Sequence, residues 1–169
     1  MKDIMIDLET LGTSFNALIT QIGACYFDRH TGEIGDTLDI NIEIGSSLDK
    51  GFSVDSGALK FWFNHSPTFL NNAVSIEKAL ALFGDFITKK SLIWCHATFD
   101  AIILANAYER INQGIPYSYR NVRDIRTLTD LAKLERKDRA EGNKDPKTHN
   151  ALEDAIYQVG YCTECFNKL

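Results

Sequence analysis

Residues 4–9, near the start of the chain, read Ile4-Met5-Ile6-Asp7-Leu8-Glu9. Successive side chains of a strand point to opposite faces, so Asp7 and Glu9 share one face of a strand here, and the aliphatic residues between them share the other. Acidic residues are uncommon in strands, and two carboxylates this close repel each other unless something positive compensates. A divalent cation held by oxygen atoms would compensate; a solvated strand edge is the other interpretation of this stretch alone.

The rest of the sequence extends this strand into a mixed sheet. Strand-like runs at residues 19–28 and 37–44 follow after short turn-rich links, which favour an antiparallel meander. Helical spacing begins at residues 54, 75, 99, 125 and 151, and short strands are predicted at 92–94 and 121–124, before a polar loop at 135–148. We therefore expect one α/β domain over residues 1–169: a five-stranded sheet, with a three-strand antiparallel meander plus two parallel strands, flanked by helices.

Composition limits the class of protein. The hydrophobic fraction of 44% and the charged fraction of 24% are typical of a globular protein, and no apolar run reaches the roughly 20 residues of a membrane span. With no secretory signal at the start, we expect a cytoplasmic protein without a membrane partner. The net charge of -5 is unevenly spread, because residues 117–149 carry nine Lys and Arg against six Asp and Glu. This segment is either a solvated loop or a basic rim that meets phosphates.

The four cysteines, at positions 25, 95, 162 and 165, do not form a strong metal motif. Cys162 and Cys165 have CxxC spacing, but a structural zinc site usually needs a second pair of ligands at similar spacing. We expect reduced, partly buried thiols on the last helix.

Two further segments place acids at helix starts. A buried strand at 92–94 feeds a helix whose first turn carries Asp100 beside Phe99, where the helix dipole alone could stabilise the carboxylate. Asn150 resembles the N-cap of a capping box, which puts Asp154 one turn inside the last helix. His149 then lies on the preceding loop, where it could reach the same site as Asp154 or serve a structural role.

Together these motifs resemble the DEDD exonuclease superfamily, histidine (DEDDh) branch, which includes ribonuclease T, oligoribonuclease and, most similar, small phage-encoded exonucleases. The resemblance covers Asp7 to Asp154. It implies a ribonuclease H-like fold, a pair of Mg²⁺ or Mn²⁺ ions, and His149 as general base. It also implies four carboxylate ligands, which are Asp7, Glu9, Asp100 and Asp154. His96 departs from the pattern, because many relatives have Asn there, and the contact to the terminal nucleotide is in doubt.

The implied activity is 3′-to-5′ hydrolysis of single-stranded nucleic acid with a free 3′ end, releasing nucleoside 5′-monophosphates. Two metals activate water and stabilise the leaving oxygen, and an ordinary histidine pKa near 6.5 suits a general base. Five residues are expected to contact substrate. Thr10 and Leu11 do so by their backbone, as the resemblance implies, and His96 contacts the terminal nucleotide. Phe99 and Trp62, or its neighbour Phe61, are expected to stack on bases, although core packing equally explains Trp62 and Phe61.

Two other functions remain at this stage. One is a catalytically weak nuclease-fold module that only binds nucleic acid or another partner, and the other is an enzyme acting on a different phosphoester. The sequence does not decide between RNA and DNA, because discrimination depends on contacts to the 2′-hydroxyl. Oligomeric state is open as well, although relatives of the ribonuclease T type are often homodimers.

Overall fold

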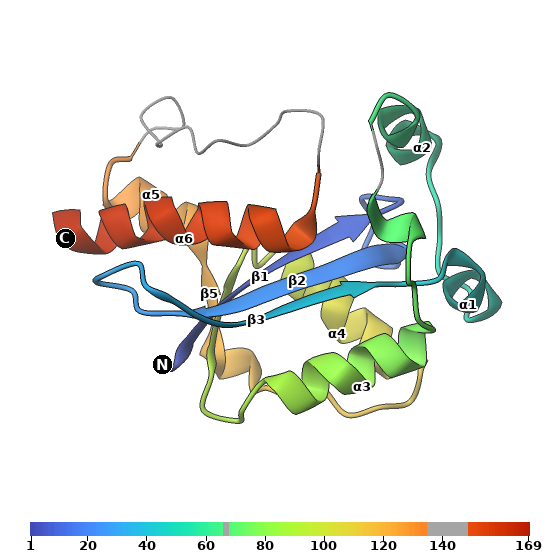
Figure 1. Ribbon diagram of the computed structural model, residues 1–169, viewed down its shortest axis with the longest axis horizontal. Helices are drawn as coiled ribbons and strands as arrows, with labels where there is room; N and C mark the ends of the chain where they lie inside the picture. Colours follow the sequence, from blue (N-terminus) through green and yellow to red (C-terminus); the bar gives the residue numbers. More distant parts are fainter. Residues whose placement is uncertain (66–67, 135–148) are drawn as a thin grey trace.

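A single mixed sheet organises the computed structural model, which describes residues 1–65, 68–134 and 149–169 (Figure 1). Its strand order is β3-β2-β1-β4-β5. The central strand β1 (Asp3–Thr10) pairs antiparallel with β2 (Ile19–Phe27), which pairs antiparallel with β3 (Ile34–Asn41). On the other side β1 pairs parallel with β4 (Leu92–Cys95), and β4 with β5 (Val122–Asp124). The predicted meander with two parallel strands is confirmed.

Helices cover both faces of this sheet. In Figure 1, α5 (Ile125–Leu131) and α6 (Ala151–Lys168) lie on one face, and α3 (Ile76–Phe86) and α4 (Asp100–Arg110) on the other. Each face has its own apolar cluster. The cluster that includes α3 and α4 contains the aliphatic residues of β1, which are Ile4, Ile6 and Leu8. Met5 belongs to the cluster under α5 and α6, as alternation along the strand predicts.

The meander ends earlier than the sequence pattern predicts. Residues 37–44 alternate as a strand would, but β3 stops at Asn41 and a short helix, α1 (Ile44–Asp49), follows. The Oγ of Ser46 accepts a hydrogen bond from the backbone N–H of Ile76, at 3.0 Å, and this contact holds α1 against the start of α3. The prediction of a strand to residue 44 was therefore wrong at its end.

Side-chain caps fix the starts of several helices. Asp55 caps α2 (Ser56–Phe63) by accepting from the N–H of Ala58. Ser75 caps α3, and Asn150 caps α6 by accepting from the N–H of Glu153 at 3.0 Å. Short 3₁₀ turns at Thr68–Leu70 and Tyr119–Asn121 complete the described elements.

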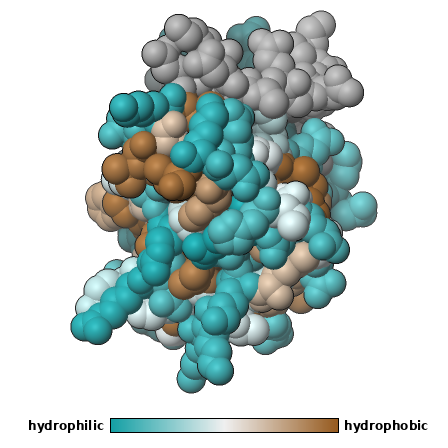
Figure 2. Space-filling view, turned by 90° about the vertical axis from the view of Figure 1, so that its left-hand side faces the viewer, coloured by the Kyte–Doolittle hydropathy of each residue, from teal (hydrophilic) through white to brown (hydrophobic). Residues whose placement is uncertain are grey.

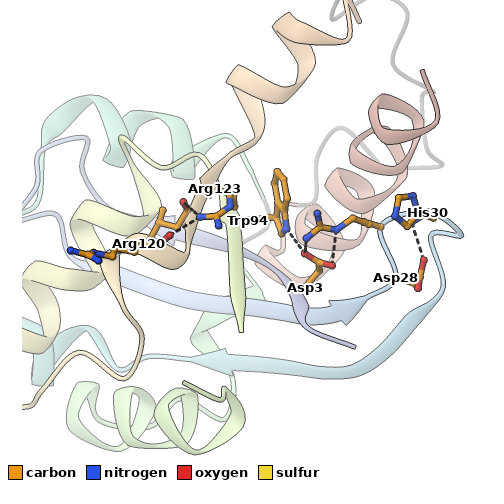
Figure 3. A network of polar contacts seen from close by, with 8 residues as sticks. Asp3, Asp28, His30, Trp94, Arg120 and Arg123 are labelled. Carbon is orange, nitrogen blue, oxygen red and sulfur yellow. Dashed lines mark hydrogen bonds and ion pairs between the residues drawn. The ribbon is translucent and has the colours of Figure 1, made fainter. Parts of the chain in front are cut away.

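A charged network closes the end of β1 that is remote from Asp7 and Glu9 (Figure 3). Asp3 is buried, and its carboxylate accepts hydrogen bonds from the indole N–H of Trp94, at 2.7 Å, and from Arg29. The guanidinium of Arg29 also lies over the rings of Trp94 and Phe166, with its Cζ 5.4 Å and 4.8 Å from the ring centroids. The network ties β1, β4 and the end of α6 together.

The molecular surface at this end is mixed in character. Figure 2 shows apolar patches separated by hydrophilic side chains. Within the described ranges, no helix is both long and apolar enough to cross a membrane.

Candidate active site

The C-terminal half of β1 carries the first two acids of the site. In the register with β2, Asp7 lies opposite Gly23 and Glu9 opposite Gln21, and the pairing shifts between Glu9 and Thr10. Glu9 is buried and Asp7 is partly buried. These two carboxylates therefore point from the sheet toward α6, on the face that the alternation of β1 predicts.

The start of α6 lies directly on β2, beside these acids (Figure 1). Gly23 permits this approach, because a Cβ at this position would lie 2.1 Å from the carbonyl carbon of Ala151. The buried side chain of Gln21 accepts a hydrogen bond from the N–H of Ala151 at 2.9 Å and donates to Asp39 at 2.8 Å. Gln21 and Gly23 thus fix where α6 begins, and with it the positions of His149 and Asp154.

A tight turn after β4 positions Asp100. The carbonyl oxygen of His96 accepts from the N–H groups of Phe99 and Asp100, at 2.8 and 2.9 Å. The N–H of His96 in turn donates to Oδ2 of Asp100 at 2.8 Å. Asp124 holds the same turn by accepting from the N–H of Ala97 at 3.1 Å. These bonds fix the acid at the first position of α4, as the sequence predicts.

Burial dominates the electrostatics of Asp100. Its carboxyl is 1% exposed, and desolvation raises its pKa to about 7, from an ordinary 3.8. The hydrogen bond from the backbone of His96 and the positive charge of Arg126 act in the opposite direction and offset only part of the rise. A cation bound beside Asp100 would stabilise the ionised form of this carboxyl.

The structure brings the predicted residues together in two groups of possible metal ligands. One group is Asp7, His96 and Asp100, and the other is Glu9, His149 and Asp154. In each group one ligand atom from every residue lies within 4.8 Å of the others. Each group offers two carboxylates and one imidazole, and oxygen-rich donor sets of this kind fit hard divalent cations such as Mg²⁺ or Mn²⁺. All four acids and His149 therefore meet at one place, as the sequence motifs predict.

Gln158 is a further residue of this site, and the sequence analysis missed it. It lies one turn after Asp154 on α6, and its buried amide Nε2 donates to Oδ1 of Asp7 at 2.6 Å. Its Oε1 is also buried and has no hydrogen-bond partner among the residues that the structure describes. The signal in the sequence was the i, i+4 spacing from Asp154, which places both side chains on one helix face.

An aromatic cluster from α2 packs against His149. The imidazole of His149 makes edge contacts with Phe61 and His65, with ring centroids 4.7 and 4.8 Å apart. His65 stacks on Phe61 at 4.0 Å, and its Nδ1–H donates to the carbonyl of Phe61 at 2.6 Å. His65 was not predicted, because only the fold brings the end of α2 beside residue 149.

A cavity of about 330 Å³ opens beside Glu9, and its walls include Phe61, Trp62 and Phe99. Phe61 is 40% exposed, whereas Trp62 is 7% exposed and donates its indole N–H to the carbonyl of Thr10 at 3.0 Å. Trp62 packs in the core and also lines the cavity, and its stacking on a base stays a prediction.

The other two predicted substrate contacts, Thr10 and Leu11, follow Glu9 in the chain. Thr10 lines the cavity, but Leu11 is buried, with its N–H donating to Leu18 and its carbonyl accepting from Asp55. The contact of Thr10 and Leu11 with a terminal sugar stays a prediction.

The remaining sequence predictions concern basic and cysteine residues. Most of the predicted basic rim, residues 135–148, lies outside the described residues. Within the described part, the exposed Arg126 donates to Oγ1 of Thr98 at 3.3 Å, next to the turn that carries Asp100. All four cysteines are free and buried, and burial raises the pKa of Cys162 to about 12. Cys162 and Cys165 are free thiols on α6, as predicted, but they are fully buried rather than partly buried.

Comparison with known proteins places this geometry in a family. Residues 2–166 match the family model of the 3′-5′ exoribonuclease Rv2179c-like domain. No curated protein matches the sequence. Among solved structures, the E. coli exonuclease I complex with a dA16 oligonucleotide is similar with a TM-score of 0.70 and 16% identity, covering 95% of this chain and 40% of that chain. The zinc-ion-bound E. coli exonuclease I–ssDNA complex gives 0.70 and 16%, covering 95% and 39%.

A third similar structure is the nuclease domain of 3′hExo, a DEDDh family member bound to rAMP, with a TM-score of 0.67 and 14% identity, covering 98% of this chain and 91% of that chain. The chain spans only 39–40% of the two exonuclease I chains, and likeness at such low identity shows a shared ribonuclease H-like fold. The family model, in contrast, covers almost the whole sequence. This chain therefore belongs to the 3′-5′ exoribonuclease Rv2179c-like family.

Proposed function

We propose that this nuclease removes nucleotides one at a time from the free 3′ end of single-stranded nucleic acid and releases nucleoside 5′-monophosphates. The observation that carries the proposal is the pairing of alternate β1 acids with acids at two helix starts: Asp7 with Asp100, and Glu9 with Asp154. The family description supports RNA as the substrate. DNA stays in the proposal, because the similar exonuclease I structures contain single-stranded DNA.

The proposed mechanism uses two divalent cations, Mg²⁺ or Mn²⁺, held by the four carboxylates. Such a pair, when bound, lowers the pKa of water and stabilises charge on the leaving oxygen. Gln158 orients Asp7 by donating to its Oδ1. His149 takes the proton of the attacking water, and its contacts with Phe61 and His65 restrict the orientation of its ring.

Recognition of the strand end is assigned to the cavity beside Glu9. The exposed ring of Phe61 and the ring of Phe99 are available to stack on terminal bases, and such stacking contributes roughly 1–3 kcal/mol per base. Arg126, next to the Asp100 turn, is the described cation best placed to meet a phosphate. A site that stacks unpaired bases favours single strands over duplexes.

The test is degradation of end-labelled single-stranded RNA, single-stranded DNA and duplexes with Mg²⁺ present. We expect stepwise release of mononucleotides from single strands by the unaltered chain and none by Asp7→Ala. Asp36→Ala is the matched control, because Asp36 is an exposed acid on β3, outside both ligand groups. Internal fragments as the first products would contradict an exonuclease.

The alternative, a catalytically weak nuclease-fold module that only binds nucleic acid, has a different signature. Such a module would bind labelled nucleic-acid strands in a filter-binding assay, but it would degrade none of the substrates at any Mg²⁺ or Mn²⁺ concentration. The complete set of four acids and His149 favours the enzyme, since a module that only binds has no use for a water-activating histidine.

A further inference from the structure

His96 lies beside two of the acids of the candidate site, Asp7 and Asp100. It follows β4 directly, and its side chain is 24% exposed. Its Nδ1 is 3.8 Å from Oδ2 of Asp100, and the imidazole can offer a ligand atom within 4.8 Å of both Asp7 and Asp100. The sequence predicts a substrate contact for His96, although many relatives have Asn at this position.

We propose that His96 is a nitrogen ligand on the Asp7–Asp100 side of the metal site, and that it shifts the preference of the site from Mg²⁺ toward Mn²⁺. This inference rests on the proposed function, since it adds a ligand to the same site. Mg²⁺ strongly prefers oxygen ligands, whereas an imidazole nitrogen is a good ligand for transition metals. Asparagine would offer a hard carbonyl oxygen at this position, so histidine changes the type of donor atom.

The backbone around His96 restricts where its ring can go. The carbonyl of His96 accepts from the N–H groups of Phe99 and Asp100, and the N–H of His96 donates to the carboxylate of Asp100. These hydrogen bonds are 2.8–2.9 Å long. Asp124 fixes the next residue of the turn through the N–H of Ala97. Only the two side-chain torsions of His96 are left to move, so little entropy is lost when the ring binds a cation beside Asp100.

The histidine of the other ligand group is held differently. The ring of His149 packs against Phe61 on α2 and against His65, which follows α2, and these contacts restrict its orientation. The ring of His96 lies beside a carboxylate, with its Nδ1 3.8 Å from Oδ2 of Asp100. Each of the two imidazoles has a ligand atom within 4.8 Å of two acids. The aromatic contacts of His149 favour its assignment as the base, and cation binding is assigned to His96.

The experiment compares the full chain with His96→Asn, in the absence of nucleic acid. Calorimetric titration gives the ratio of the Mg²⁺ and Mn²⁺ dissociation constants for each protein. We expect His96→Asn to weaken Mn²⁺ binding about tenfold or more while changing Mg²⁺ binding little, because loss of a metal-site interaction typically costs 10- to 100-fold. Pulsed electron paramagnetic resonance of bound Mn²⁺ should show nitrogen coupling that decreases in the variant.

The matched control is His30→Asn, at the exposed turn between β2 and β3 (Figure 3). It should leave both the ratio and the coupling unchanged. If His96→Asn lowers the melting temperature in chelator, His96→Gln is measured as the second variant. An unchanged ratio with unchanged nitrogen coupling would overturn the role of His96, while Mg²⁺-dependent degradation of RNA by the same proteins would leave the proposed function intact. Absence of any cation binding by the unaltered chain would contradict both.

Discussion

The burial of Asp100 predicts that the metal-free protein loses stability as the pH rises. The folded-state pKa of this carboxyl is about 7, whereas its ordinary value is 3.8. Between these two values the folded chain binds a proton that the unfolded chain has released, so the free energy of unfolding falls as the pH increases. The stabilisation is present at low pH and is lost as the pH passes through 7. Asp100→Asn should remove this contribution.

The size of the effect follows from the two pKa values. Each pH unit in this window changes the free energy of unfolding by about 1.4 kcal/mol for one proton. Between pH 5 and pH 8 the loss is roughly 2–3 kcal/mol, because the carboxyl is mostly ionised above pH 7. For a chain of this length, a change of that size lowers the melting temperature by roughly 5–10 °C.

Urea unfolding in chelator at pH 5, 6, 7 and 8 measures the effect. The comparison uses slopes against pH, so it is insensitive to a constant cost of the Asn side chain in a buried site. The slope of the unaltered chain should be more negative than that of Asp100→Asn by roughly 1 kcal/mol per pH unit. Asp36→Asn, an exposed acid on β3, should keep the slope of the unaltered chain. Parallel curves for the unaltered chain and Asp100→Asn would refute the reasoning. At pH 8, Mn²⁺ should stabilise the unaltered chain more than Asp100→Asn, because the cation requires the ionised carboxylate.

Three further predictions concern the positioning of the site. Gly23→Ala should reduce the free energy of unfolding by about 3 kcal/mol, because the added Cβ would overlap the backbone at the start of α6. Gly160→Ala is the control and should not destabilise the protein, because nothing lies within 4 Å of a Cβ there. Equal urea midpoints for the two variants would contradict this prediction. Gln158→Met should weaken cation binding about tenfold in calorimetry, because Asp7 loses its amide donor, and unchanged affinity would show that the bond has no role. His149→Ala should lower kcat about 10²- to 10⁴-fold while still binding Mn²⁺, and undiminished turnover at neutral pH would exclude it as the base.

The sequence predicts those parts of the fold that depend on local patterns. Alternation along residues 4–9 correctly places Asp7 and Glu9 on the face of the sheet that α6 covers. Capping residues correctly mark the starts of α3 and α6, because their hydrogen bonds span only three residues. The end of β3 was missed, since it depends on a contact between α1 and α3, 30 residues apart in sequence.

The candidate site shows the same division. Its four acids and His149 were identified because each belongs to a short motif. Gln21, Gly23 and Gln158 were not, although a polar residue and a glycine inside an apolar strand were visible signals. Their roles depend on register and on helix placement, as the contact between Gln21 and Ala151 spans 130 residues. The position of His96 within a ligand group likewise required the fold.

Two buried carboxylates show how the chain treats opposite ends of its sheet. Asp3, 7% exposed, is compensated within the chain by the guanidinium of Arg29 and the indole of Trp94. Asp100, 1% exposed, receives a backbone N–H and lies near Arg126, yet its pKa is still raised to about 7. The internal donors therefore do not offset its burial. Below pH 7 a bound proton neutralises the carboxyl of the metal-free chain, and a bound cation would replace that proton.

This difference links catalysis to stability. A cation that binds the folded chain and not the unfolded chain stabilises the fold by mass action. The gain is largest beside a carboxylate whose ionised form is strongly destabilised by burial. A cation at Asp100 would stabilise its buried carboxylate, as Arg29 already does for the carboxylate of Asp3. An internal arginine at the Asp100 end would make the metal-free protein more stable, but it would occupy the place of the proposed cations. The predicted loss of stability of the metal-free protein at neutral pH is thus a consequence of keeping the acids available for cations.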